Sequence, residues 1–298
     1  MEKKFKSLSI FEFQERFTND EDCRRYLYNK KWANGFTCEK CGHTRCGKGQ
    51  REYVVKCNSC NMQYSPTSGT LFHKVKFPLL KAFYIVFYVS TSKKGISSTE
   101  LSRKLDLRQK TCWLFKRKVM AAMKSSGKHP LDGDIEVDET NIGGQESKTR
   151  GRKNIKKKLV VIALERHKET GAPRAYARVI ENAGSKQLST FFENHINTNA
   201  NITTDKWRGY RPLKKTHKKI RQLESGKKGK NFPVMHRWIM GLKGWLRGVH
   251  HHATDLQAYL DEYTYRYNRH FMKEGIFENL LNRMLVHEPV PYKLIKVN

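Results

Sequence analysis

The sequence has no long hydrophobic run. Its longest apolar stretch, Ala82 to Val89, is far shorter than the ~20 residues that a membrane-spanning helix needs. The first residues, Met1 to Phe13, are charged and lack an apolar core, which is not the pattern of a secretory signal peptide. No repeat with a solenoid period is present either. These absences argue against membrane and repeat architectures, and we expect a cytoplasmic, nucleoid-associated protein.

Acidic residues are scarce. Lys and Arg number 59 against 28 Asp and Glu, which gives a formal net charge of +31. Such an excess of like charge indicates a polyanionic partner, because the free protein repels itself. Membrane surfaces are polyanionic too, but no segment supports insertion, so we expect nucleic acid. The 298 residues, 38% of them hydrophobic, are enough for about two domains and a small module.

Cysteine is sparse as well, but it is not scattered. Four of the seven cysteines form two Cys-x-x-Cys pairs separated by 15 residues: Cys38, Cys41, Cys57 and Cys60. Two such pairs on facing hairpins supply the four thiolates of a structural zinc ion, and they suit a reducing compartment better than a disulfide framework. We therefore predict a zinc ribbon, with Gly42 and Asn58 in its tight turns.

The other three cysteines, Cys23, Cys46 and Cys112, fall outside this pattern, and we interpret them as bystanders. Cys46 with His43 is an alternative pair of zinc ligands.

A helical segment follows the ribbon. An apolar stretch from Pro78 to Thr91 leads to a capping sequence at Ser97 or Ser98 and then to a basic stretch from Gln109 to Met123. In this last stretch, basic residues are interleaved with apolar ones: Lys110, Lys116, Arg117 and Lys118. A second helix of this kind is typical of a helix-turn-helix recognition helix. The alternative is a helical hairpin whose charges are only solvated.

The second half of the chain alternates between strand and helix patterns, after a linker at Ser125 to Pro130. Expected strands span residues 134–138, 159–164, 175–180, 201–205 and 219–223, and expected helices span 185–196, 234–246 and 255–269. A three-stranded meander, a helix, a strand and later helices is the order of an RNase H-like α/β domain.

Two aspartates in this half are candidate metal ligands. Asp138 and Asp205 are each expected to end a strand, and glycines follow Asp138 closely. Cleavage of a phosphodiester by two metal ions needs carboxylates, and Mg²⁺ prefers such hard oxygen ligands. Each aspartate alone has another interpretation, as a turn residue or a helix cap, so the pair needs its context.

That context is a family resemblance. Asp138 within Val-Asp-Glu-Thr, Asp205 within Thr-Asp-x-Trp-x-Gly-Tyr, and the stretch Leu242 to His251 resemble bacterial insertion-sequence transposases of the DDE type. More narrowly, they look like the zinc-ribbon group related to the Merlin elements. The resemblance covers nearly the whole chain. It implies an enzyme that binds the ends of a mobile element, cleaves DNA to free 3′-hydroxyls and joins them to target DNA, using Mg²⁺ or Mn²⁺.

In that family, the third acidic position lies on the helix after the last strand, seven residues before a lysine. Counting back from Lys243 gives His236, so this chain has an Asp-Asp-His-Lys variant of the motif. His236, Met240, Lys243 and Arg247 lie on one helical face. A neutral imidazole is a poor Mg²⁺ ligand but an acceptable Mn²⁺ ligand, and it can also move a proton. The alternative is a histidine with no role at the metal, and Glu224 or Glu262 are possible substitutes.

Further residues are candidates on the last helix. Glu262, Arg266 and Arg269 share one helical face with offsets of four and seven, and the same spacing accompanies the catalytic residues in members that this chain resembles. The resemblance implies active-site support or phosphate contact. The alternative is an ordinary surface salt bridge.

Two basic runs flank these motifs. Residues 148–158 hold seven Lys and Arg, and residues 211–230 hold nine. Both are expected to contact DNA phosphates without reading bases.

These observations predict a ribbon region at residues 1–75, a helical DNA-binding segment at 76–127, an RNase H-like catalytic domain at 128–285 and a tail at 286–298. The expected partner is double-stranded DNA, bound by a homodimer or a higher assembly. The competing hypothesis is a catalytically inactive relative that only binds specific DNA.

Overall fold

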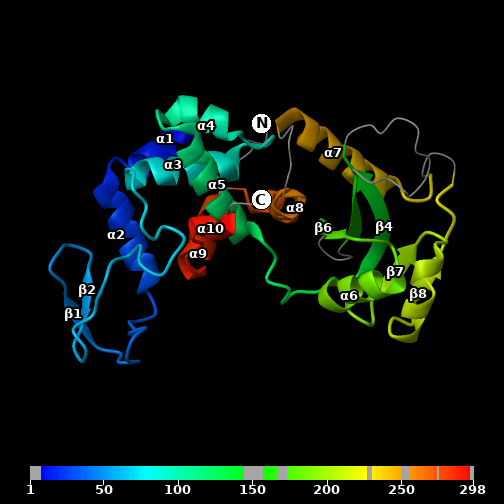
Figure 1. Cartoon of the computed structure of the whole chain (residues 1–298), viewed down its shortest axis with the longest axis horizontal. Coiled ribbons are helices and arrows are strands. Elements are labelled where there is room, and N and C mark those ends of the chain that lie inside the picture. The colour runs from blue at the N-terminus through cyan, green and yellow to red at the C-terminus, as the bar shows by residue number, and fades with distance from the viewer. Residues whose placement is uncertain are drawn as a thin grey trace, which may run out of the picture. The chain divides into compact units, whose positions relative to one another are not determined.

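The computed structural model describes residues 8–143, 157–166, 173–226, 230–249, 255–273 and 275–295. The chain divides into two compact units, which are described separately (Figure 1). The first unit contains residues 1–123 and 272–298, and the second contains residues 124–271. The sheet-containing unit therefore ends before the boundary at 285 that the sequence predicts, because the helix after it packs with the N-terminal helices.

The first unit begins with two capped helices. Helix α1 (Ile10–Arg16) starts at a capping box formed by Ser9 and Glu12, and α2 (Asp20–Lys31) starts at Asn19, whose side chain accepts two backbone N–H groups. Three short antiparallel strands form the ribbon sheet. They are β1 (Cys46–Lys48), β2 (Val55–Cys57) and β3 (Gln63–Tyr64).

The helices of the first unit share an aromatic core. This part contains α3 (Leu79–Thr91), α4 (Ser98–Leu105), α5 (Gln109–Met123), α9 (Gly275–Val286) and α10 (Tyr292–Ile295). Helix α3 is buried along most of its length, and α9 packs against both α3 and α5. Ser97 is the N-cap of α4, as the sequence predicts, and its hydroxyl accepts the N–H of Glu100.

One expected DNA contact on α5 is not available. Lys116 is only 4% exposed, and its ammonium group donates to the carbonyl oxygen of Ile96 at 2.7 Å. The position lies four residues from both Cys112 and Met120, which are buried on the same face. The interpretation of Lys116 as a solvent-facing base between core positions is therefore wrong, whereas Lys110 on the same helix is exposed.

The second unit is built on a five-stranded mixed sheet with the strand order β6-β5-β4-β7-β8 (Figure 1). Its strands are β4 (Asp134–Ile142), β5 (Lys158–Arg166), β6 (Pro173–Ile180), β7 (Asn201–Thr204) and β8 (Ile220–Gln222). The first three strands are antiparallel, and β7 and β8 continue parallel to β4. Two short 3-10 helices, η1 (Arg208–Tyr210) and η2 (Pro212–Lys215), lie between β7 and β8.

Helices bury both faces of this sheet. Helix α6 (Ser185–His195) packs on one face with Leu188, Phe191 and Phe192, against alternate residues of β4 such as Ile135 and Val137. Helices α7 (Pro233–Val249) and α8 (Leu256–Arg269) cover the other face, and a third 3-10 helix, η4 (His270–Met272), follows α8. The predicted strands and helices of this half all form.

The strand that carries Asp138 is longer than the sequence indicates. Asp138 does not end it: β4 continues to Ile142 and pairs with β5 along its whole length, from Asp134↔Arg166 to Ile142↔Lys158. The prediction that Asp138 emerges where the chain leaves the sheet is wrong. Asp205, in contrast, directly follows the last residue of β7, as predicted.

Helix α8 covers the outer edge of β6 with two side-chain amides. Asn268 bonds to both the N–H and the carbonyl of Ala175, at 2.6 and 2.9 Å. Gln257 accepts the N–H of Val179 at 2.9 Å and donates to the carbonyl of Ala177 at 3.2 Å. The backbone groups of this edge strand are therefore hydrogen-bonded by side chains instead of by another strand.

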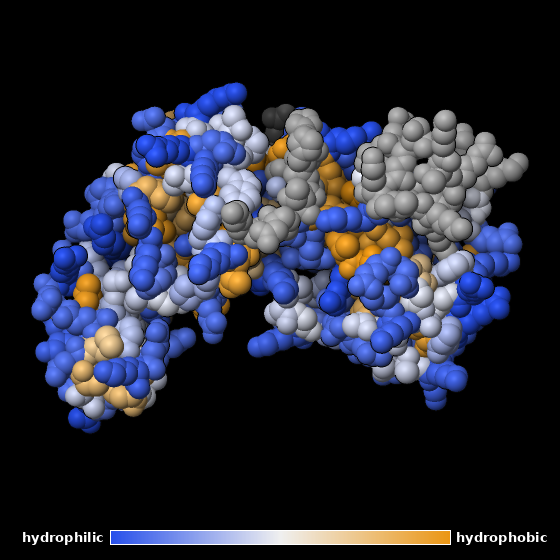
Figure 2. All heavy atoms as spheres, viewed as in Figure 1, coloured by the Kyte–Doolittle hydropathy of each residue, from blue (hydrophilic) through white to orange (hydrophobic). Residues whose placement is uncertain are grey.

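Among the described helices, none combines the length and the apolar character that a bilayer crossing requires. Hydrophilic residues make up most of the visible surface of each unit (Figure 2).

Candidate functional site

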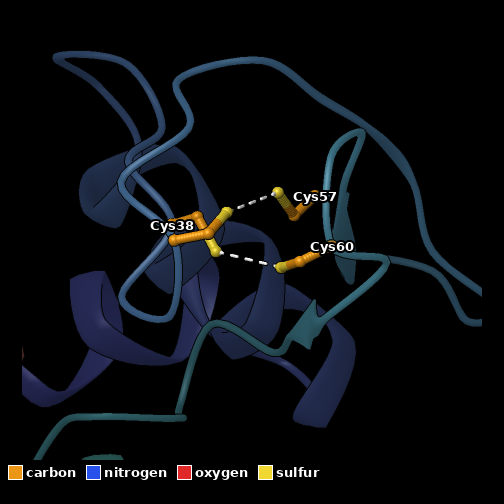
Figure 3. Close-up of side chains that lie close together, drawn as sticks. Cys38, Cys57 and Cys60 are labelled. Carbon is orange, nitrogen blue, oxygen red and sulfur yellow. Dashed lines mark hydrogen bonds between the residues drawn. The ribbon is translucent and has the colours of Figure 1, made fainter.

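The four paired cysteines of the ribbon converge, and each of their sulfur atoms lies within 4.8 Å of the others. The Sγ atoms of Cys38 and Cys60 are 3.5 Å apart (Figure 3). Those of Cys41 and Cys57 are 3.6 Å apart. These separations are much longer than a disulfide bond and near the ~3.8 Å edge of a zinc tetrahedron with Zn–S bonds of ~2.3 Å. The cluster fits a structural zinc ion.

The two knuckles have the same backbone turn. Gly42 follows the first Cys-x-x-Cys pair with a φ of +72°, and its N–H donates to the carbonyl of Cys38 at 2.9 Å. Asn61 follows the second pair with a φ of +58°, and its N–H donates to the carbonyl of Cys57 at 3.1 Å. Asparagine tolerates this left-handed conformation better than most residues. Asn61, and not Asn58 as predicted, is therefore the counterpart of Gly42.

Tyr64 of β3 packs against this cluster. Its hydroxyl lies 3.2 Å from Cys38 Sγ and accepts the N–H of Lys40 at 3.2 Å. Burial opposes ionisation of Cys38, but the hydrogen bonds to its sulfur, led by that of Tyr64, lower the pKa of the thiol to about 6. The thiolate is the form that binds zinc. Cys23, Cys46 and Cys112 do not join the cluster.

A second cluster lies in the sheet unit and consists of carboxylates. Oxygen atoms of Asp138, Glu139 and Asp205 all lie within 4.8 Å of one another, and the three residues are partly buried. Strand register explains the meeting of the two aspartates. Val137 of β4 pairs with Thr204 of β7, so the next residue on each parallel strand is the aspartate. Asp138 and Asp205 thus lie side by side where β7 ends.

Glu139 is the residue that sequence reasoning missed. It follows Ile135 and Val137 at alternate positions of β4, so its side chain is on the α6 face of the sheet. Asp138 is on the opposite face, and its Oδ1 accepts the N–H of Glu139 at 2.8 Å. Pairing with β7 ends at Val137, so no strand lies beside Asp138 and Glu139 on that side of β4, and both carboxylates reach Asp205. The alternation of β4 was the available signal.

The segment after Asp205 is held in place by several contacts. Asp205 Oδ1 accepts the N–H of Trp207 at 2.9 Å, and the indole N–H of Trp207 donates to the carbonyl of Ala183 at 2.7 Å. A Cβ atom on Gly209 would lie 2.5 Å from that same carbonyl oxygen and 2.7 Å from the indole nitrogen. The Trp and Gly of the Thr-Asp-x-Trp-x-Gly-Tyr motif therefore fix the loop that presents Asp205.

The tyrosine of this motif lies beside the carboxylates. Tyr210 is fully buried. Burial, and then the negative charge of Glu139, raise the pKa of its phenol well above its ordinary value of 10, with smaller contributions from Asp138 and Asp205. The phenol therefore stays protonated and presents an O–H group to the acidic cluster.

Helix α7 begins over the same strand. The N–H of Met235 donates to the Glu136 carboxylate at 3.3 Å, which fixes the first turn of α7 on β4. His236 lies in this turn and is partly buried, but it is not a member of the carboxylate cluster. The cluster of carboxylates therefore does not include His236, which was predicted to complete the site with the two aspartates.

Lys243 lies further along α7, among other cations. Partial burial lowers the pKa of its ammonium group, and the positive charges of Lys157 and Arg247 lower it further. Such a group of cations is suited to an anion such as a phosphate. Met240, on the same helical face, is 70% exposed.

The last predicted group forms a buried ion pair. Glu262 is fully buried, and its Oε1 accepts two hydrogen bonds from Arg266, at 3.1 and 3.2 Å. An ordinary surface salt bridge is therefore excluded for Glu262 and Arg266, whose side chain is only 13% exposed. The guanidinium carbon of Arg269 lies over the ring of Tyr265, 4.2 Å from the ring centroid. None of these residues belongs to the carboxylate cluster.

Glu224, the other suggested substitute, is exposed and pairs with Lys206 at 2.7 Å. In the first basic run, residues 148–158, the structure describes only Lys157 and Lys158. In the second, residues 211–230, it describes all residues except 227–229. The described lysines of this second run, among them Lys214, Lys215, Lys218 and Lys219, are exposed.

Comparison with known families matches both clusters to described domains. Residues 18–63 match the model of the transposase zinc-ribbon domain, which includes all four clustered cysteines. Residues 130–268 match the model of the ISXO2-like transposase domain, which includes the three clustered carboxylates. No curated protein matches the chain significantly. The chain therefore carries a transposase zinc-ribbon domain followed by an ISXO2-like transposase domain.

Proposed function

We propose that this protein is an active transposase, which binds the ends of a mobile DNA element, cleaves a phosphodiester to free a 3′-hydroxyl and joins it to target DNA. The observation that carries the proposal is the convergence of Asp138 and Asp205, within a segment that matches a transposase domain. The order of the strands and helices in the second unit supports an RNase H-like catalytic fold.

The donor set fits a divalent cation. Asp138 and Asp205 would hold Mg²⁺ or Mn²⁺, with Glu139 as a third carboxylate in place of the missing helix glutamate. The chemistry that such an ion would supply is that of a Lewis acid at the attacking hydroxyl and the leaving oxygen of the phosphodiester. Tyr210 would keep a neutral phenol near these carboxylates, because burial and the charge of Glu139 raise its pKa well above 10.

Two further helices contribute positive charge and protons. We propose that His236, which is partly buried in the first turn of α7, moves a proton or adds a nitrogen ligand. Lys243, which lies among the cations Lys157 and Arg247, would contact the DNA backbone. Glu262, Arg266 and Arg269 remain candidates for active-site support because of the family resemblance. Within the structure, Glu262 and Arg266 form a buried ion pair, and Arg269 lies over the ring of Tyr265.

The first unit supplies sequence recognition. The zinc ribbon and the α4–α5 pair, which has a helix-turn-helix order, bind the element ends, and the exposed beginning of α5 offers Arg108, Gln109 and Lys110. Two or more copies act together on DNA in the cytoplasm, at the nucleoid.

The decisive experiment separates cleavage from binding. Asp138→Asn or Asp205→Asn keeps the size of the side chain but removes the charge that holds a cation. Strand cleavage of a DNA fragment with the element end should fall about a thousandfold or more, while binding of the same fragment changes little. Glu224→Gln, in the exposed pair with Lys206, is the matched control and should cleave normally.

Cleavage that survives both substitutions would overturn the proposal. Wild-type binding with no cleavage in either Mg²⁺ or Mn²⁺ would favour the inactive, DNA-binding relative. That alternative draws on one observation, namely that His236 stands outside the carboxylate cluster.

The role of His236 has its own test. If it occupies the third position, His236→Glu should retain or gain Mg²⁺-supported cleavage, and the wild type should cleave faster with Mn²⁺ than with Mg²⁺. His236→Ala should lose less activity than Asp138→Asn, because an imidazole brings no ligand charge. Equal rates with both metals in wild type and His236→Glu would remove His236 from the site.

A further inference from the structure

A cavity of about 530 Å³ opens in the second unit on the α6 side of the sheet. Its walls come from the ends of β4, β5 and β6, from the loop before α6 and from Trp207. The volume lies in the ~300–1,000 Å³ range of sites that bind small organic groups. The roles proposed above for the carboxylates and the basic residues do not use this cavity.

The cavity is next to the acidic cluster. Asn141, on its wall, lies two residues beyond Glu139 on the same face of β4, which is about 7 Å along a strand. Trp207, on another wall, donates its backbone N–H to Asp205 at 2.9 Å. A chemical group bound in the cavity is thus a direct neighbour of whatever the carboxylates hold.

The walls match the chemistry of one nucleotide. Leu159 and Ile180 supply apolar surface, and Trp207, fixed by its bond to Ala183, places an aromatic side chain on the wall, the kind of group on which bases stack. The Arg208 guanidinium lies over one face of the Trp207 ring, 5.6 Å from its centroid. The amides of Asn141 and Asn182 offer both donors and acceptors to the edge of a base. Lys157 adds a cation for the attached phosphate.

We propose that this cavity receives an unpaired nucleobase of the DNA strand, adjacent to the phosphodiester at the carboxylates. This inference rests on the proposed function, because it assumes that the carboxylates next to the cavity hold a DNA phosphodiester. In a duplex, bases are stacked inside the helix, so the base enters only after leaving the stack, at a cost of a few kcal/mol. The substrate is therefore a DNA end or junction at which one base pair is open.

Photocrosslinking without added Mg²⁺ or Mn²⁺ tests the cavity without requiring cleavage and leaves the zinc of the ribbon in place. The probe is a single-stranded oligothymidylate that carries one 4-thiothymidine. We expect its crosslinks in the full-length protein to map to residues 179–184 or to Trp207, and to decrease when a complementary strand pairs the modified base.

Two variants with the same change of charge and size sharpen the test. Glu181→Trp places an indole at an exposed position on the cavity wall, and Glu193→Trp places one at an exposed position of α6 away from it. The first should lose most of the crosslink, and the second should keep it.

Crosslinks that map only to other segments, or equal crosslinking in the two variants, would overturn the proposal. Because no cleavage is measured, an enzyme without strand cleavage that still shows this crosslink would refute the proposed function and keep the cavity. An enzyme that cleaves DNA but does not show this crosslink would refute the nucleobase site and keep the proposed function.

Discussion

The ribbon and the acidic cluster draw their ligands from very different spans of the chain. The four cysteines lie between residues 38 and 60 on neighbouring turns, and only a small core, including Phe36, Val55 and Tyr64, packs around them. Asp138 and Asp205 are far apart in the sequence, and the pairing of β4 with β7 brings them together between two large apolar cores. We therefore expect the ribbon to need its metal in order to fold, and the sheet to position its carboxylates before any metal binds.

The largest expected effect follows from the ribbon. Cys38→Ser or Cys57→Ser should abolish the binding of about one zinc ion per chain and unfold the ribbon, since structural zinc contributes on the order of 10–16 kcal/mol in small domains. Zinc stoichiometry and limited proteolysis measure both outcomes. Cys46→Ser, outside the cluster, should keep its zinc. A ribbon that resists protease after zinc removal would break the comparison.

In the sheet unit, the largest effect should come from a buried charge. Glu262→Gln leaves Arg266 without its ion-pair partner in a site where the arginine side chain is 13% exposed. We expect a loss of about 3–5 kcal/mol in the free energy of unfolding, measured by urea denaturation. Glu193→Gln, at an exposed position of α6, is the control. If stability is unchanged but cleavage falls, Glu262 acts in the chemistry and not in the fold.

A smaller effect of opposite sign is expected at Asp261. Burial raises the pKa of this carboxyl from 3.8 to about 6, although a hydrogen bond from Gln257 opposes the shift. Because the folded-state pKa is the higher one, the folded protein holds the proton more tightly, and this stabilisation is lost as the pH rises from about 4 to 6. Asp261→Asn should therefore stabilise the sheet unit at pH 7 by at most about 3 kcal/mol.

The gain from Asp261→Asn should vanish near pH 4, where the wild-type carboxyl is protonated as well. Thermal unfolding at the two pH values measures this difference. A gain that is independent of pH would show that burial of the charge is not its cause.

The sequence predicts these two regions unequally well. Ligand spacing predicts the ribbon, because its cluster is local and its turns need only Gly42 and a left-handed residue. Alternation and breakers predict the strand and helix order of the sheet unit as well. The predicted end of β4 at Asp138 was wrong. The next residues, Glu139, Thr140 and Asn141, are polar and so do not continue an apolar strand pattern, although β5 pairs with all of them. Strand pairing is a long-range property, so a single strand pattern does not reveal it.

The membership of the acidic cluster shows the same limit. The cluster contains Glu139, which alternation places on the α6 face of β4, opposite to Asp138, so the strand pattern alone does not bring the two carboxylates together. Only the early end of β7 lets both reach Asp205. Helical periodicity places His236 and Lys243 on one face, but it does not give the distance from that face to the strands.

The amide side chains of Gln257 and Asn268 have a consequence for assembly. They occupy the backbone groups of β6 at one border of the sheet, and the opposite border, β8, is only three residues long. A sheet without a long open border offers little template for a strand from another molecule. If copies of this chain associate, we therefore expect them to do so through side-chain surfaces and not through continuous β-structure.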